Sequence, residues 1–398
     1  MSFKNICLFA FIVVVFLGCV TPYYPNITKY ENLLVVDGQL TNLKGPYIVK
    51  LTRTAKVTGG KVAVGTTSTQ TENQVIGAQI KIIDNTGLEV LLKEISNGVY
   101  STVDTTFRGV SGKGYKVQIK VNNDVYESDF ETLKEPIPID RVYWEYKSND
   151  FDGPKRIQLL LNTHDPANNT HYYGWEFNET WKFKVPIEIT PNPEWRICYQ
   201  NGTSSIFNIG TTINRNVDIV EGHLLQTINE NTNRLFIRYT LLARQYSFTE
   251  QTYKYLEDLN KLNLNQGTLF DPTPYSLVGN IKSLNDKNIP VVGYFVVAGA
   301  TEKRIFIDRS ELPKEYYPND GFTECTTYLV KVPKTLINFR DNHKVDSLMR
   351  EGYSIFQQLD IWLDPATPGW QLSLAKTRCY NCTAIGDNNA PDFWTEKK

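Results

Sequence analysis

Four cysteines in the second half of the chain have the most clearly defined chemistry. Cys379 and Cys382 form a C-x-x-C pair, whereas Cys198 and Cys325 stand alone. The pair suits redox chemistry or half of a zinc site. However, zinc needs a second pair of ligands, and a redox pair normally opens a helix. An even number of cysteines in an exported protein favours two structural disulfides, with three connectivities open. We therefore expect disulfides here, and neither a metal nor another cofactor.

A further cysteine, Cys19, ends a short apolar segment near the start of the chain. The segment runs from Ile6 to Leu17 and follows Lys4. A charged start, an apolar stretch and a small residue are the marks of a secretory signal peptide, and Phe16-Leu17-Gly18-Cys19 is a lipobox. A membrane-spanning helix would need about 20 apolar residues. We expect residues 1–18 to be removed and acyl chains on Cys19 to anchor the protein outside the cytoplasm. A plain secretory signal is the alternative.

Histidines and carboxylates form no catalytic motif. His164-Asp165 and His171 fall near one expected turn and could bind a metal, but no HExxH spacing supports this. Solvated loop histidines are the favoured interpretation. The sequence holds neither a GxSxG elbow nor a GxxxxGK[ST] phosphate loop. We expect no catalytic residues, and hence no enzyme.

Aromatic residues gather between Tyr143 and Trp181. Aromatic faces can stack on sugars or other flat apolar ligands. Strand positions also alternate between two faces, so about half of these rings should point into a core. Core packing is the favoured interpretation, and Tyr173, Trp175 and Trp181 are the candidate ligand contacts.

Composition points to an exported, mainly β protein. The 398 residues include 42 basic and 43 acidic ones, a balance that excludes an electrostatic nucleic-acid partner. The length suggests two domains. Abundant aromatic, Asn, Thr, Val and Ile residues favour strands and turns over helices.

Short strands at regular intervals predict the first domain. Tyr115–Val121 alternates apolar and polar residues throughout, and Asn97-Gly98 is typical of a tight hairpin turn. About seven such strands fit an immunoglobulin-like β-sandwich over residues 31–135, joined to Cys19 by a tether over residues 19–30.

Alternate prolines at Pro136 and Pro138 mark a linker, and strand patterns resume beyond it. Residues 139–398 are predicted to form a larger β-rich domain with one inserted α-helix near 247–265. A capping box at Ser247-Phe248-Thr249-Glu250 opens that helix. Residues 291–297 and 303–307 are predicted to form a hairpin.

Several short motifs resemble those of one family. They are Leu34-Val35-Val36-Asp37-Gly38, Tyr47 to Thr54, Gly98-Val99-Tyr100, Phe107-Arg108-Gly109, Gly279-Asn280-Ile281, Gly293-Tyr294-Phe295, Cys379-Tyr380-Asn381-Cys382-Thr383 and Pro391-Asp392-Phe393-Trp394. Together they resemble domain-of-unknown-function family 4249, lipoproteins of Bacteroidota outer membranes often encoded beside TonB-dependent transporters. The resemblance implies no catalytic residues.

These observations predict an outer-membrane lipoprotein, on the periplasmic or the surface face. We expect a non-enzymatic accessory of a TonB-dependent nutrient uptake system. Its expected partners are a β-barrel transporter and a small ligand, peptide or glycan. A structural or adhesive envelope module is the alternative, and a glycan-acting hydrolase is a third.

Overall fold

The computed structural model describes residues 32–54, 73–148, 155–189, 191–204, 207–264, 277, 279–322 and 324–395. The expected signal peptide, Cys19 and the tether lie outside the described residues. The described chain is mainly β, as the composition predicts. Within that part, no helix has the length and apolar character needed to cross a membrane.

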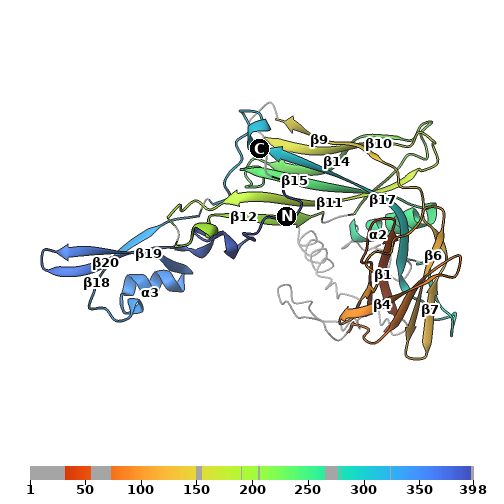
Figure 1. Cartoon of the computed structure of the whole chain (residues 1–398), viewed down its shortest axis with the longest axis horizontal. Coiled ribbons are helices and arrows are strands. Elements are labelled where there is room, and N and C mark those ends of the chain that lie inside the picture. The colour runs from red at the N-terminus through yellow and green to blue at the C-terminus, as the bar shows by residue number, and fades with distance from the viewer. Residues whose placement is uncertain are drawn as a thin grey trace, which may run out of the picture.

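An N-terminal sandwich forms where the alternating strands predict it, at the lower right of Figure 1. Its neighbours run β1-β2-β5-β4-β3-β6-β7, and β8 pairs with β6. Alternate residues such as Val49, Ile80 and Val117 fill its core. Gly98 supplies the positive φ of the β4–β5 turn. The strands are β1 (Leu34–Thr41), β2 (Ile48–Arg53), β3 (Gln79–Asp84), β4 (Glu89–Ser96), β5 (Val99–Thr102), β6 (Gly114–Val121), β7 (Asp124–Ser128) and β8 (Glu131–Thr132).

Residues 31–135 do not complete this sandwich alone. Strand β16 (Ile281–Ser283) pairs with β7. The first half of β17 (Val292–Asp308) pairs in parallel with β1, from Val35↔Val292 to Thr41↔Ala298. The predicted first domain therefore takes two strands from the later part of the chain, a long-range pairing that local sequence patterns do not reveal.

Strand β17 corrects the predicted hairpin over residues 291–307. It is one continuous strand of 17 residues. Its second half pairs with β15 (Arg238–Ser247), so pairing on both halves keeps it extended. Gly299 lies at the crossing, where an added Cβ would be 2.3 Å from the carbonyl oxygen of Lys134. The glycine marks close passage of the linker and not a turn.

The second sandwich lies across the top of Figure 1. One layer contains β15 and β17 with β11 (Tyr172–Lys184), β12 (Ile197–Thr203) and β13 (Asn208–Thr211). The other layer has the order β14-β10-β9, formed by β9 (Ile139–Lys147), β10 (Arg156–His164) and β14 (Ile219–Asn229). Side chains from both layers, including Leu159, Trp175 and Leu241, share one core.

Helix α2 (Glu250–Leu264) confirms the predicted helix near residues 247–265. Its cap differs from the prediction, because Thr249 Oγ1 accepts the Thr252 N–H at 3.1 Å. Ser247 Oγ instead accepts the backbone N–H of Ile137 at 3.4 Å.

An arm projects from the body at the left of Figure 1. It contains the sheet β18-β20-β19 and helix α3. The sequence predicted a single helix, near 247–265, so α3 was not expected. Only Val345 and Leu348 of α3 are buried, too few for a recognisable helical period. The elements are β18 (Tyr328–Pro333), α3 (His343–Arg350), β19 (Tyr353–Asp364) and β20 (Thr367–Lys376). Short 3₁₀ turns lie at Pro193–Trp195, Arg309–Glu311, Phe339–Asp341, Thr377–Cys379 and Cys382–Ala384.

Two disulfides confirm the interpretation of the cysteines. Cys198 bonds Cys382 and Cys325 bonds Cys379, so the C-x-x-C residues have different partners. The Cys325–Cys379 bond closes the base of the arm. The Cys198–Cys382 bond holds the C-terminal tail against β12, where Trp394 packs 4.9 Å from Tyr199 between ring centroids.

Candidate functional site

A cleft of about 390 Å³ lies where the N-terminal sandwich meets α2 and the second sandwich. Ligand sites occur preferentially at such domain junctions. Strands β1, β2, β15 and β17, helix α2 and the segment before β13 contribute to its walls. The lining residues are Asp37, Gly38, Gln39, Pro46, Tyr47, Ile48, Lys50, Phe207, Tyr246, Phe248, Leu256 and Val296.

Aromatic rings form the wall that belongs to the second sandwich. The ring centroids of Phe207 lie 5.5 Å from those of Tyr246 and 6.0 Å from those of Phe248. Tyr246 and Phe248 stack at 5.8 Å. The Tyr246 hydroxyl donates to Glu176 Oε1 at 2.6 Å, and burial raises the pKa of Tyr246, so the ring is neutral and fixed. This wall offers rigid apolar surface.

Polar groups form the opposite wall, on the N-terminal sandwich. Alternation along β1 exposes Asp37 and Gln39 while Val36 and Leu40 enter the core. Lys50 is the cross-strand partner of Asp37. A carboxylate, an amide and an ammonium group thus face a cleft whose other side is aromatic, and the two charges balance.

An ion-pair network extends from the aromatic wall along the sheet. Arg244 Nη1 lies 2.5 Å from Glu176 Oε1, and Arg244 Nε donates to Glu302 Oε1 at 2.8 Å. Glu176 also accepts the hydrogen bond from the Tyr246 hydroxyl, so strands β11, β15 and β17 together hold the tyrosine ring in one orientation.

A buried carboxylate fixes α2 beside the cleft. Glu131 of β8 accepts hydrogen bonds from the hydroxyls of Tyr294 and Thr249, the latter at 2.9 Å. Burial raises the pKa of Glu131. Tyr255 of α2 stacks on Tyr294 with centroids 4.5 Å apart, and burial raises the pKa of Tyr255 to about 12. Strands β8 and β17 of the N-terminal sandwich therefore help to fix the position of the helix.

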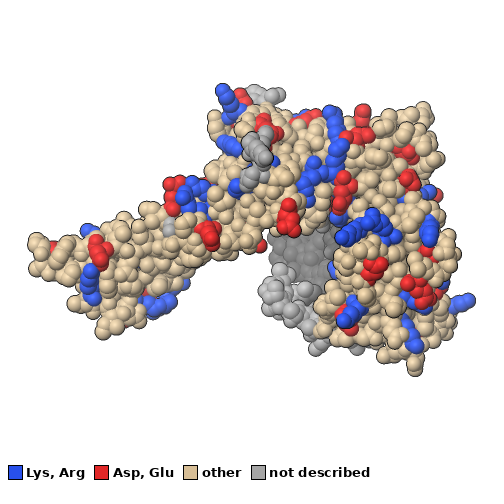
Figure 2. Space-filling model, viewed as in Figure 1, with Lys and Arg blue, Asp and Glu red and all other residues tan. Residues whose placement is uncertain are grey.

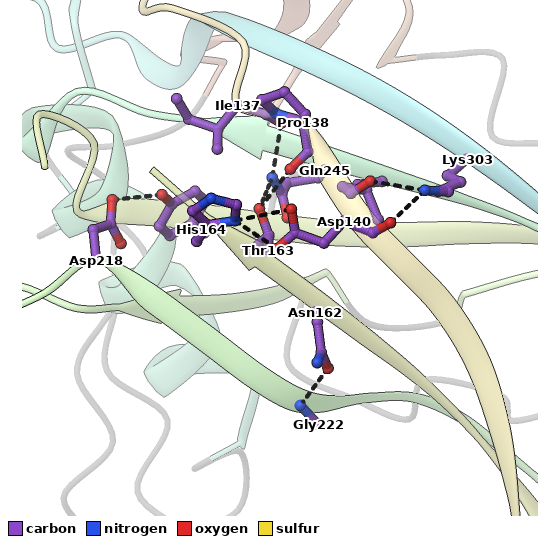
Figure 3. A network of polar contacts seen from close by, with 12 residues as sticks. Ile137, Pro138, Asp140, Asn162, Thr163, His164, Asp218, Gly222, Gln245 and Lys303 are labelled. Carbon is purple, nitrogen blue, oxygen red and sulfur yellow. Dashed lines mark hydrogen bonds and ion pairs between the residues drawn. The ribbon is translucent and has the colours of Figure 1, made fainter. Parts of the chain in front are cut away.

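A second polar network fixes the linker on the far side of the sheet (Figure 3). Gln245 Nε2 donates at 3.0 Å to both Ile137 O and Thr163 Oγ1. Gln245 Oε1 accepts from Trp175 Nε1 at 2.9 Å. Thr163 Oγ1 donates to Pro138 O at 2.8 Å. Since this face of the sheet is opposite the cleft, we assign the network to domain orientation.

The histidines near the expected turn do not converge. His164 Nδ1 lies 2.8 Å from Asp140 Oδ2, and this pair raises the pKa of His164 (Figure 3). Asp165 accepts backbone N–H groups of its own turn, including that of Thr170 at 2.9 Å. His171 Nδ1 lies 3.3 Å from Thr212 Oγ1. Among the described residues, no group of three His, Cys, Asp or Glu side chains could hold a metal.

The three candidate ligand contacts are buried in the core, which agrees with the favoured interpretation of the aromatic cluster and not with the ligand-contact alternative. Tyr173, Trp175 and Trp181 are 0%, 2% and 8% exposed. All three sit on the face of β11 that packs against β9, β10 and β14. The opposite face of the sheet carries Tyr246 toward the cleft, so these three rings lie on the side away from it.

The sequence alone does not reveal the cleft. Two of its polar wall residues, Asp37 and Lys50, lie in motifs that carry the family resemblance, Leu34 to Gly38 and Tyr47 to Thr54. Exposed polar side chains that alternate with core residues in such motifs were the sequence signal that could have identified this wall. No sequence signal marks Phe207 and Phe248 as cleft residues, because segments distant in the chain bring them together.

Comparison with known proteins gives a family and no function. A search of curated proteins found no match. The model of the family described as "Domain of unknown function (DUF4249)" matches residues 20–304, which include the N-terminal sandwich, α2 and every wall of the cleft. This match covers well over half of the chain, and the chain therefore belongs to the DUF4249 family.

Proposed function

We propose that this protein is a non-enzymatic binding protein whose cleft between the two sandwiches holds a small amphipathic ligand. The arrangement of the cleft carries the proposal. One wall is aromatic and rigid, and the other has a carboxylate, an amide and an ammonium group. Its volume of about 390 Å³ falls within the range of small-molecule sites.

A neutral glycan fits this chemistry best. Sugar rings have one apolar face that can stack on an aromatic side chain and hydroxyls that bond carboxylates and amides. Asp37 and Lys50 are neighbours of opposite charge, so the polar wall favours a ligand without net charge. A peptide is the competing ligand, because its backbone amides could use the same polar groups.

A cleft-filling variant tests the binding proposal. Ile48 lines the cleft from β2, and Ile48→Trp should fill it. Leu91→Trp is the control, because Leu91 is exposed on β4 and does not line the cleft. We expect one of the neutral hexasaccharides of glucose, xylose or mannose to raise the Tm of the wild type and of Leu91→Trp, but not of Ile48→Trp. If only hexapeptides raise the Tm, the ligand is a peptide and not a glycan. If neither class raises the Tm, or if both variants show equal Tm shifts, binding in the cleft is contradicted.

The same proposal places the protein on the outer membrane as an accessory of a TonB-dependent transporter. Phe16-Leu17-Gly18-Cys19 supports lipid attachment at Cys19. An accessory that captures a ligand beside a transporter needs such an anchor and an open cleft. Mass spectrometry of the mature N-terminus should show an acylated Cys19, and an unmodified residue there would contradict the anchor.

The arm supports a second candidate function, a structural or adhesive envelope module. Figure 2 shows long uncharged stretches along the arm. Trp362 is 68% exposed and Ile337 fully exposed. We take these two exposed side chains as the contacts that such a module would use. In-cell cross-linking distinguishes the two functions. If the protein is an adhesive module, the double variant Trp362→Ser/Ile337→Ser should lose its cross-linked partners. The cleft variant Ile48→Trp should keep them.

A further inference from the structure

We propose a second binding site, for a single-chain anionic amphiphile such as a fatty acid, at the end of the N-terminal sandwich. A cavity of about 430 Å³ lies there and shares no residue with the cleft between the sandwiches. Its walls come from the start of β1, strand β16, the loop that follows it and the start of β17. The lining residues are Leu33, Leu277, Gly279, Ile281, Lys282, Ser283, Leu284, Lys287, Ile289, Pro290, Val291 and Val292.

The interior of this cavity is aliphatic. Leu, Ile, Val and Pro side chains make up most of the lining, and no aromatic ring is among the described residues that line it. Leu284 and Ile289 are 54% and 47% exposed, so water contacts apolar surface that an alkyl chain would cover. A flexible hydrocarbon suits such walls better than a flat ring, which would gain from aromatic stacking.

The charged groups of the cavity all have one sign. Lys282 and Lys287 belong to the lining, and no carboxylate stands among the described residues that line it. Both lysines are exposed, so their ammonium groups lie at the solvent side of the walls. Lys282 Nζ lies 2.9 Å from Asp129 Oδ1, which leaves Lys287 as the principal contact for an anionic head group. Apolar walls with cations at the rim complement an amphiphile with a negative head.

The position of the cavity agrees with a membrane-derived ligand. Leu33, at the start of β1, is part of the wall and follows Cys19 by 14 residues. An extended segment of that length reaches at most about 50 Å. If Cys19 carries the anchor, the cavity opens within reach of amphiphiles released from the membrane. The proposed occupant is a free amphiphile and not the acyl chain of Cys19 itself.

Titration calorimetry with decanoate and dodecanoate, below their micelle concentrations, tests this site. Residues 20–398 are used, which omit the expected signal peptide and Cys19 and keep all core residues of the described part of the chain. We expect one bound amphiphile, with dodecanoate binding about 10-fold more tightly than decanoate for its two additional methylenes. Absence of saturable binding, or equal affinity for both chain lengths, would overturn the proposal.

Charge variants identify the cavity as the place of binding. Lys287→Glu should weaken dodecanoate binding at least 10-fold, whereas Lys93→Glu, the same change at an exposed position on β4, should leave it unchanged. Ile289→Asp should abolish binding, with Leu91→Asp as its control. Equal effects of a variant and its control would overturn the assignment. The acylated full chain should bind as residues 20–398 do, and loss of binding there would show that its own lipid is the occupant.

Discussion

Two asparagines extend the hydrogen bonding of β17 with their side chains. Asn280 donates to Phe295 O at 3.0 Å and accepts the Phe295 N–H at 2.9 Å. Asn42 does the same at Ala300, just beyond Thr41↔Ala298, the last pair of the parallel β1–β17 ladder. Each amide supplies both bonds that a neighbouring strand would make. This gives Asn280, within one of the motifs that carried the family resemblance, a structural role.

Asn280→Ala should therefore destabilise the protein. The substitution leaves a buried N–H and a buried C=O of Phe295 without partners, which costs about 2–4 kcal/mol of unfolding free energy. Urea unfolding followed by tryptophan fluorescence would measure the loss. Asn285→Ala is the control, because Asn285 accepts the Val125 N–H in an exposed setting and should lose less than about 1 kcal/mol. Equal losses in the two variants would contradict this role.

His223 should make stability depend on pH. Its ring lies 3.9 Å from the Trp175 ring between centroids, and burial lowers the pKa of His223 to about 4. The unfolded chain protonates this histidine near its ordinary pKa of 6.5. Between these values the unfolded state binds more protons, so stability falls as pH falls from 6.5 toward 4. The loss from this group at pH 5 should be about 2 kcal/mol.

His223→Phe should remove that part of the pH dependence while keeping a ring on Trp175. Unfolding free energies at pH 7 and pH 5 would measure it. His343→Phe, at an exposed position on α3, should retain the wild-type difference. An unchanged difference in His223→Phe would show that other groups cause the dependence.

Local residue patterns predicted the core better than the site. Period-two alternation over Tyr115–Val121 predicted the strand whose Val117 and Ile119 enter the core. The same alternation does not distinguish a ring that faces the core from one that faces a ligand. That difference depends on tertiary packing, here of β11 against β9, β10 and β14. Tyr173, Trp175 and Trp181 were therefore the candidate ligand contacts beside the favoured core interpretation, and Tyr246 was not among them.

At the scale of elements, β17 joins the two sandwiches. Its first half pairs with β1 and its second half with β15. Gly293 starts this arrangement with φ +104°, and an added Cβ would lie 1.9 Å from Val36 O. Backbone of β1 and β17 approaches too closely there for any side chain.

Gly293→Ala should break the β1–β17 pairing. Gly77→Ala is the matched control, since Gly77 also has a positive φ but open space around its Cβ position. The control should cost about 1–2 kcal/mol for backbone strain alone. Gly293→Ala should cost at least about 3 kcal/mol or fail to fold, because strain and steric overlap combine. Thermal unfolding would compare them, and similar losses would contradict the close approach.

The two disulfides should stabilise different parts of the molecule. Cys325→Ser/Cys379→Ser opens the base of the arm, so hydrogen exchange should rise within residues 326–378 and stay unchanged in both sandwiches. Cys198→Ser/Cys382→Ser releases the tail from β12 and should lower the stability of the body by about 2–4 kcal/mol. Faster exchange throughout the body in the first variant would show that the arm is not an independent element.

Element types followed from the sequence, whereas long-range connections did not. Strand β6 and helix α2 were predicted within a few residues, since hydrophobic period and capping residues are local. The predicted hairpin over residues 291–307 was wrong because β17 stays extended by pairing with β1 and β15, which are distant in the sequence. Helix α3 was missed because its eight residues bury only two side chains.

At the scale of the whole molecule, the fold combines a cleft between two sandwiches with an arm. The arm projects from the end of the second sandwich that lies away from the N-terminal sandwich (Figure 1). Lys and Arg are interspersed with Asp and Glu on the face shown in Figure 2. This face therefore offers no surface of one dominant charge for recognition. Shape and local chemistry in the cleft, together with apolar contacts along the arm, suit a protein that holds a ligand while it contacts a partner.

Affinity purification of the tagged full chain from membranes of its own organism tests the accessory role most directly. The account predicts that a β-barrel transporter is recovered in an amount comparable to the tagged protein, and that it is lost when Cys19→Ala removes the anchor. Recovery of the folded, acylated protein without any barrel would contradict the account.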